Sequence, residues 1–176
     1  MCIRDRVRTA GLTDALVCIP GTHCKWARLR GGTLVDFRTF ATGELFQLLR
    51  HQSLVGALGE GDATAPEAFA RGVARGASSM LSHAVFAARA NTLGGTLAPE
   101  DLSSYLSGVL IGAEIAAQDF PAGQDVILLA TGALADRYAE ALRLRGIGTR
   151  RIDAKDATRA GLALAARQLW FQDAAA

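Results

Sequence analysis

The sequence has little net charge and no long apolar run. Its formal net charge is +2 at pH 7, and its longest basic run is Arg150–Arg151. A balance so close to neutrality does not favour nucleic acid or an acidic membrane surface as a partner. The most apolar stretch, GVLIGAEIAA, is interrupted by Glu114 and is too short to cross a bilayer. We therefore expect no nucleic-acid partner and no membrane partner.

Cysteine and lysine are also scarce. The three cysteines, Cys2, Cys18 and Cys24, form neither an even-numbered disulfide framework nor a CxxC pair, which favours a reducing, cytoplasmic setting. Only Lys25 and Lys155 are lysines among the nineteen basic residues. An ammonium is a compact charge and a guanidinium a planar fork, so a retained lysine can mark a position that needs the compact charge.

The first residues lack a recognisable pattern. MCIRDRVRTAG contains three arginines and an aspartate, shows no helical or strand periodicity, and has no apolar core of the kind found in secretory signals. We expect residues 1–10 to be a truncated or non-native lead-in to one folded domain, residues 11–176. Half of the 176 residues are apolar and a fifth are charged, which is ordinary for a globular domain with one core.

The pattern of apolar residues predicts an α/β domain with a mixed sheet flanked by helices. A buried strand and a Gly-Gly hairpin come first, and helices then alternate with further strands. Strands are predicted over residues 15–20, 24–30, 33–39, 124–132 and 148–153. Helices are predicted over residues 44–55, 66–79, 79–90, 99–118, 133–146 and 157–171.

Single residues mark some of the helix boundaries and contacts. Thr42 is predicted to be an N-cap, with Glu44 in the first turn where the helix dipole favours a carboxylate. Pro66 suits the first position of a helix. Gly108 and Gly112 lie one turn apart, so we expect that face of their helix to approach a sheet closely.

The turn in CIPGTHCKW, residues 18–26, is the first candidate site. Gly21 and Thr22 offer backbone N–H groups and a hydroxyl to a phosphate, and Lys25 adds positive charge. The Walker pattern G-x-x-x-x-G-K-[ST] is absent. Residue chemistry alone therefore allows phosphate binding at this turn but favours a plain hairpin turn.

Other chemistries fit this turn less well. Cys18, His23 and Cys24 are close in sequence, but neighbours on an extended strand point to opposite faces, and no second ligand pair follows at zinc-like spacing. The same geometry disfavours a Cys24–His23 nucleophilic pair. Cys18 lies inside an apolar run and is interpreted as a core thiol. We expect no metal held by cysteine and histidine.

A second candidate is LLATGALADRY, where a buried strand ends at Thr131-Gly132 and a helix follows. Ligands of open α/β sheets bind at the carboxyl ends of strands, and a glycine there lets a nucleotide come close. An ordinary strand-to-helix turn would have the same pattern, so this segment by itself indicates no function.

Four segments in order, IPGTHCKW, DFRTFATGELFQLLRHQSLVG, YLSGVLIGAEIA and LLATGALADRYAEAL, closely resemble the 2-dehydro-3-deoxygalactonokinases. These sugar-acid kinases belong to the superfamily of actin, the heat-shock ATPases and hexokinase. The resemblance runs from about Leu16 to the C-terminus. It implies the C-terminal lobe of an actin-like (ribonuclease H-like) ATPase fold. It also implies ATP-dependent phosphorylation of 2-dehydro-3-deoxy-D-galactonate to its 6-phosphate, in the cytoplasm and with Mg²⁺.

The resemblance also implies the nucleotide-binding residues. Gly21 and Thr22 would face the β- and γ-phosphates, with His23 and Lys25 as helpers. Thr131, Gly132 and Ala133 would form the adenosine turn. The sequence there is ATGAL, where the superfamily often has paired glycines. Glu44 would either position magnesium through water or only favour the start of its helix.

The resemblance leaves part of a kinase unaccounted for. The family's DxGTS-like first-lobe turn is absent from this sequence, and the general base is expected in that missing N-terminal lobe. Phosphoryl transfer needs both sides of the cleft, so we expect residues 11–176 to be an ATP-binding lobe that is inactive alone. The partners would be ATP and a sugar acid, with a homo-oligomer also possible. The alternatives are a kinase for another sugar acid and a non-catalytic nucleotide-binding or interaction module.

Overall fold

The structure is a computed structural model that describes residues 12–120, 123, 125–153, 159 and 163. The predicted lead-in, residues 1–10, lies outside the described residues, as does almost all of the predicted last helix, residues 157–171. The strands are β1 (Ala15–Ile19), β2 (Cys24–Arg30), β3 (Thr33–Phe40), β4 (Val126–Leu129) and β5 (Thr149–Ile152). The helices are α2 (Thr42–Gln52), α3 (Pro66–Ser78), α4 (Leu81–Leu93), α5 (Leu102–Ala116) and α6 (Gly132–Leu144), with short 3-10 turns η1 (Gly56–Leu58) and η2 (Pro99–Asp101).

The five strands form one mixed sheet in the order β3-β2-β1-β4-β5, which confirms the predicted class. Strands β1, β2 and β3 are antiparallel neighbours, whereas β4 and β5 run parallel to β1. The β2–β3 hairpin turns at Gly31 and Gly32, whose φ angles of 53° and 72° suit a two-residue turn that only glycine adopts easily. The β1–β2 register pairs Ile19 with Lys25, so the candidate phosphate turn closes this end of the sheet.

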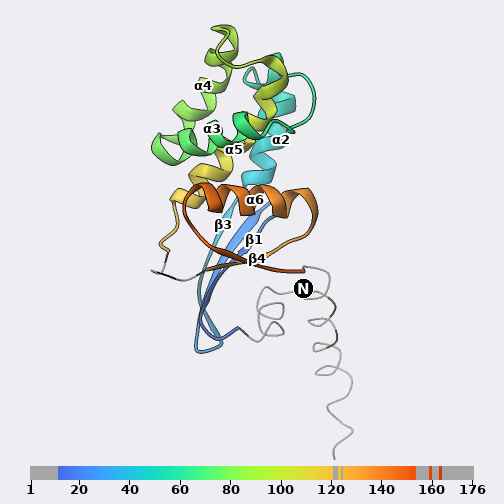
Figure 1. Ribbon diagram of the computed structural model, residues 1–176. Helices are drawn as coiled ribbons and strands as arrows, with labels where there is room; N and C mark the ends of the chain where they lie inside the picture. Colours follow the sequence, from blue (N-terminus) through green and yellow to red (C-terminus); the bar gives the residue numbers. More distant parts are fainter. Residues whose placement is uncertain (1–11, 121–122, 124, 154–158, 160–162, 164–176) are drawn as a thin grey trace, which may run out of the picture.

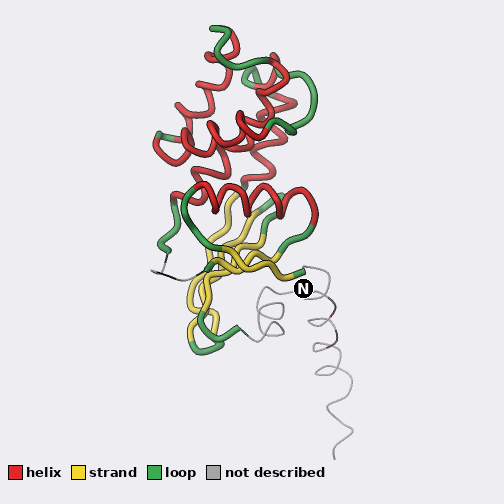
Figure 2. Tube along the Cα trace, viewed as in Figure 1, coloured by secondary structure: helices red, strands yellow, loops and turns green. Residues whose placement is uncertain are grey.

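The helices lie in two places relative to the sheet. Helix α6 lies across one face of the sheet, and α2, α3, α4 and α5 are grouped beyond it (Figure 1). Figure 2 shows the same division between strands and helices. One buried cluster joins the sheet to the helices and includes Leu16, Trp26, Val73, Ile115 and Leu142. The core therefore continues from the sheet into the helical group.

The approach of the α5 glycines is to another helix, so the expected contact with a sheet is wrong. A Cβ on Gly112 would lie 2.8 Å from Val73 Cα, and a Cβ on Gly108 would lie 2.9 Å from Val73 N. Helix α3 supplies Gly72 and Gly76 on its own side of this contact, where a Cβ would meet the α5 backbone. Glycine on both helices lets their backbones touch, because no side chain separates them.

The predicted cap at Thr42 is also wrong. Helix α2 begins at Thr42, its N-cap is Ala41, and no side chain caps it. The Thr42 hydroxyl is buried and donates to the Glu114 carboxylate of α5 instead. The predictions for Pro66 as the first residue of α3 and for Glu44 in the first turn of α2 are confirmed.

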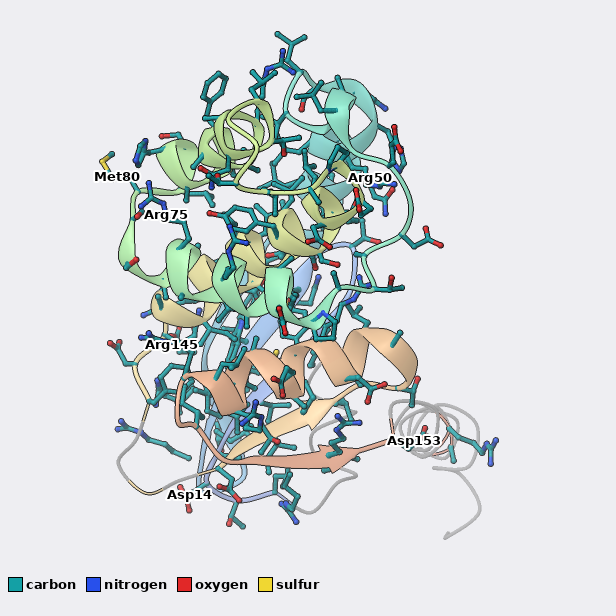
Figure 3. All side chains as sticks on the ribbon, turned by 45° about the horizontal axis from the view of Figure 1, so that its top comes forward. Asp14, Arg50, Arg75, Met80, Arg145 and Asp153 are labelled. Carbon is teal, nitrogen blue, oxygen red and sulfur yellow. The ribbon has the colours of Figure 1, made fainter. Side chains whose placement is uncertain are left out.

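Polar contacts and exposed side chains mark the outer part of the helical group. Arg50 of α2 donates to the Gly61 carbonyl and to Ser103 Oγ, tying the loop after α2 to α5 (Figure 3). Met80 precedes α4 and is largely exposed. None of the helices in the described part of the chain has the length and apolar character needed to cross a membrane.

Candidate functional site

A pocket of about 250 Å³ lies where the β1–β2 turn, α2, α5 and α6 meet. Polar lining residues come from the turn and from all three helices, and the apolar lining residues come from the helices. The lining residues are Gly21, Thr22, Thr42, Gly43, Phe46, Gln47, Ser107, Leu110, Ile111, Leu134, Arg137 and Tyr138. Segments far apart in the sequence thus share one hollow.

The β1–β2 turn is held against the start of α2 by backbone contacts. The Glu44 N–H donates to the Thr22 carbonyl at 3.0 Å. A Cβ on Gly43 would lie 2.7 Å from the Gly21 oxygen and 2.8 Å from Thr22 Cα, so only glycine fits there. Gly21 itself has open space, since a Cβ on it would meet only the His23 oxygen, at 3.9 Å. Contacts with α2 therefore hold one side of the turn, and Gly21 leaves space for a ligand on the other.

The charged side chains of the turn lie beside the pocket and do not line it. His23 Nε2 is 2.7 Å from Glu44 Oε2, and each side chain is about half exposed. Lys25 Nζ donates to the His23 carbonyl at 2.7 Å. These contacts bring the predicted helpers His23 and Lys25 together with Glu44 at the turn. Glu44 lies in the first turn of α2, where the helix dipole favours a carboxylate, and its side chain contacts His23.

Two helix N-termini border the pocket. Thr42 and Gly43 open α2, and Leu134 lies in the first turn of α6. The unpaired N–H groups and the dipole of a helix N-terminus favour an anion nearby. Arg137 of α6 adds a guanidinium to the lining, and its Nη2 also donates to the Ala63 carbonyl at 2.8 Å. The N-terminus of α2, beside the β1–β2 turn, is the part of the pocket best suited to phosphate groups.

The predicted adenosine turn lies at the start of α6, one residue before the lining begins. Thr131, Gly132 and Ala133 are exposed, and Leu134 follows them into the pocket wall. Gly132 has a φ of 69°, a conformation that favours glycine whatever ligand is near. The wall beyond it is apolar and comes from α2 and α5. One pocket therefore combines a surface suited to phosphate groups with an apolar surface.

A buried cluster lies under the turn. Cys18 Sγ and Cys24 Sγ are 3.9 Å apart, and ligand atoms of Cys18, Cys24 and Glu114 all lie within 4.8 Å of one another. Burial raises the pKa of both thiols above their ordinary value, and the Glu114 carboxylate adds to the rise. Metals take the thiolate form of cysteine, which this burial disfavours. His23, the third residue of the sequence-based metal hypothesis, is half exposed and pairs with Glu44 instead.

Several residues of this region were missed by sequence reasoning. Thr42 and Gly43 belong to the TGEL motif, in which Gly43 could have signalled a close backbone approach. Arg137 and Tyr138 reach the pocket only because α6 lies across the sheet. The contact between Cys18 and Cys24 could have been expected from the hairpin register, which turns alternate residues to the same face.

The chain is similar to sugar-acid kinases. A family model described as 2-keto-3-deoxy-galactonokinase matches residues 6–165. A curated probable 2-dehydro-3-deoxygalactonokinase of Rhizobium meliloti (strain 1021) is 40% identical over 167 residues, which cover 91% of this chain and 55% of that protein. The 2-dehydro-3-deoxygalactonokinase of Escherichia coli (strain K12) is 38% identical over 152 residues, which cover 85% of this chain and 52% of that protein.

A solved structure has a similar fold. It is the crystal structure of a candidate 2-dehydro-3-deoxygalactonokinase protein from Sinorhizobium meliloti, with a TM-score of 0.83 and 35% sequence identity. The match covers 94% of this chain and 59% of that one. The chain thus spans about half the length of the curated relatives that it matches.

Proposed function

The chain belongs to the 2-keto-3-deoxy-galactonokinase family, whose model matches residues 6–165, and we propose that it is the ATP-binding lobe of such a kinase. The reaction proposed for the whole protein is transfer of the γ-phosphoryl group of ATP to the 6-hydroxyl of 2-dehydro-3-deoxy-D-galactonate. The observation that carries the proposal is the pocket between the β1–β2 turn and α6, which two helix N-termini border.

The phosphates of ATP fit best at the turn. Gly21 leaves space for a ligand, Thr22 offers an exposed hydroxyl, and the N-terminus of α2 favours negative charge. Lys25 and His23 add positive charge or hydrogen-bond donors at the edge of this region. Glu44, whose backbone N–H donates to the Thr22 carbonyl, would position Mg²⁺ through water. Magnesium, when bound, would neutralise charge on the β- and γ-phosphates.

The nucleoside fits at the opposite side of the pocket. The turn formed by Thr131, Gly132 and Ala133 lies at the carboxyl end of β4, where ligands of α/β sheets commonly bind. The lining there continues through Leu134 and the apolar residues of α2 and α5. A flat base and a ribose suit such a surface better than a phosphate does.

The sugar acid and the general base are expected on a second lobe. The family's first-lobe phosphate turn has no counterpart in this sequence, and phosphoryl transfer depends on charge stabilisation from both sides of a cleft. We therefore infer that this chain binds Mg-ATP but does not phosphorylate a sugar acid alone. The buried free thiols Cys18 and Cys24 suit the reducing cytoplasm in which such a kinase would act.

Nucleotide titration of the chain tests the proposal. Thr22→Val and Lys25→Ala should each weaken Mg-ATP binding by about 5- to 10-fold in calorimetry, as expected for the loss of one hydrogen bond or charge at a phosphate. Matched controls at the far end of the β2–β3 hairpin are Thr33→Val and Arg30→Ala, which should bind ATP like the wild type. Wild-type affinity in both site variants would remove the assignment of the turn. Ready Mg-dependent phosphorylation of the sugar acid by the chain alone would contradict the two-lobe requirement.

A further inference from the structure

Glu114 is a buried carboxylate that no step of the proposed function uses. It lies near the C-terminal end of α5 and is 3% exposed. It is the one charged side chain among the buried residues in the part of the chain that the structure describes. A buried carboxylate costs free energy unless hydrogen bonds compensate for its lost water. An apolar residue at this position could not accept the same hydrogen bonds.

Three hydrogen-bond donors from three different elements converge on this carboxylate. Trp26 Nε1 of β2 donates to Glu114 Oε1 at 2.6 Å. The Tyr138 hydroxyl of α6 donates to Oε2 at 2.9 Å, and the Thr42 hydroxyl of α2 donates to the same oxygen. An indole N–H can only donate, so at least this contact requires an acceptor at Glu114. The carboxylate thus joins β2, α2 and α6 to α5 at one point.

Two of the three donors, Thr42 and Tyr138, line the nucleotide pocket. Thr42 precedes Gly43, whose backbone is in contact with Gly21 and Thr22 of the phosphate turn. Tyr138 lies on α6, the helix that begins at the adenosine turn. Thr42 and Tyr138 both line the pocket, whereas Glu114 does not and borders a separate hollow with Phe40 and Leu81.

From this geometry we propose that Glu114 is a positioning residue, which fixes the distance between the phosphate turn and the adenosine helix so that one ATP molecule contacts both. The inference rests on the proposed function, since it assigns a role within the same ATP site. The hydrogen bonds of a buried, fully satisfied network restrict its members to one arrangement, which apolar packing does less strictly. Glu114 acts through Thr42 and Tyr138 and does not touch the nucleotide.

The direction in which ATP affinity changes in Glu114→Gln distinguishes a positioning role from a purely electrostatic one. A carboxylate near the phosphates repels them, so an uncharged glutamine would leave ATP binding unchanged or strengthen it if position did not matter. If Glu114 sets position, Glu114→Gln should weaken ATP binding. The amide keeps the shape of the side chain, but it presents an NH₂ group to donors that had an acceptor before.

The experiment compares the affinities of the chain for Mg-ATP and for AMP by calorimetry. In Glu114→Gln we expect ATP affinity to fall about tenfold, the size expected for hydrogen bonds to a charged group, and AMP affinity to fall less than about twofold. AMP lacks the β- and γ-phosphates that would contact the phosphate turn. The ratio of the ATP and AMP affinities therefore reports on the position of the phosphate turn relative to the adenosine turn. A matched control on the same helix is Val109→Ala, which lowers the thermal midpoint but should keep the ratio.

Thr42 supplies a second test that does not depend on Glu114→Gln folding. Thr42→Val removes the hydroxyl and keeps the shape, so ATP affinity should fall, whereas Thr42→Ser keeps the hydroxyl and should recover most of that loss. In a Glu114→Gln background the loss caused by Thr42→Val should shrink, because the two residues act as one unit.

The outcomes decide between the inference and the function on which it rests. An unchanged or higher ATP-to-AMP affinity ratio in Glu114→Gln overturns the positioning role, as does an undiminished effect of Thr42→Val in the Glu114→Gln background. If the wild-type chain binds no ATP, the proposed function fails and the positioning role fails with it. That failure is visible in the wild type alone and is thereby distinguishable from the first two.

Discussion

Helix α5 makes two contacts of opposite kinds. Against α3 it presents Gly108 and Gly112 to the matching glycines of that helix, with backbones touching. Against β2, α2 and α6 it presents the Glu114 carboxylate to three donors. The first contact tolerates no added volume, and the second tolerates no change of hydrogen-bonding chemistry.

The difference between these contacts follows from what each must hold. The α3–α5 contact is close packing between two helices, so its stability depends on dispersion and on the absence of strain. The contact at Glu114 brings together elements that carry the two ends of the nucleotide pocket, and directional hydrogen bonds fix their relation. One helix therefore serves stability along one face and the proposed site along another.

The largest effect is expected from a substitution that adds volume to the glycine contact. In Gly112→Val, a Cβ would lie 2.8 Å from Val73 Cα, so the helices must separate along their whole contact. We expect the free energy of unfolding to fall by about 4 kcal/mol, at the upper end of overpacking effects. Urea denaturation followed by circular dichroism measures the loss.

Ala113→Val is the matched control for this prediction. Ala113 is the next residue of α5, is only partly buried and borders a hollow beside Leu45 and Leu81. The larger side chain should change stability by less than about 1 kcal/mol. Equal losses in both variants would mean that crowding against α3 is not the cause.

A smaller loss is expected when the chemistry of the polar contact is changed. Glu114→Leu fills similar space but leaves the indole N–H of Trp26 and two hydroxyls without their acceptor. We expect a loss of about 3 kcal/mol, because each buried donor without a partner carries a desolvation penalty. Glu114→Gln should lose about 1 kcal/mol, since the amide oxygen still accepts. If the leucine variant is more stable than the wild type in the same urea titration, the hydrogen bonds to Glu114 do not stabilise the fold.

Local signals predicted the parts of this fold that local physics decides. Gly31-Gly32 predicted the hairpin because both positions need positive φ, and Pro66 predicted the start of α3 because its missing N–H is tolerated there. The predicted strands and helices within the described residues are present, with ends shifted by a few residues. These features depend on neighbours in sequence.

Long-range partners account for what the sequence could not predict. Thr42 has the chemistry of an N-cap, but a carboxylate 72 residues away accepts its hydroxyl. Gly108 and Gly112 correctly indicated a close approach, although nothing in their spacing distinguishes a helix from a sheet as the partner. The turn residues Gly21 and Thr22 could be proposed from sequence, whereas Arg137 and Tyr138 enter the pocket only through the packing of α6.

High pH should lower the free energy of unfolding through the two buried thiols that lie beside the polar contact. Burial raises the pKa of the Cys18 and Cys24 thiols, with the Glu114 charge adding to the rise, so the folded state keeps both protonated. The unfolded chain releases these protons above about pH 8.5, so the stabilisation is complete below that pH and is lost as pH rises further. By pH 9 we expect a loss of about 1.4 kcal/mol relative to pH 8, with about 0.7 kcal/mol from each thiol.

Urea titrations at several values between pH 8 and pH 10 measure this slope. The pKa of Tyr138 is also raised by burial, and its contribution begins near pH 10, at the upper end of this range. The double variant Cys18→Ala, Cys24→Ala should be less stable throughout but should show a flatter dependence on pH. The same slope in the double variant would assign the loss to other groups.

The smallest effect is expected at a polar contact on the helical side of α5. Ser104 Oγ accepts the Ala65 N–H at 2.8 Å, a single neutral hydrogen bond. Ser104→Ala should cost about 1 kcal/mol in urea denaturation, the net value of one such bond. It should change neither the pH slope nor the affinity for ATP, because Ser104 has no contact with the Glu114 network. A change in ATP affinity as large as that of Glu114→Gln would mean that any buried polar loss on α5 disturbs the pocket, and the distinction between its two contacts would fail.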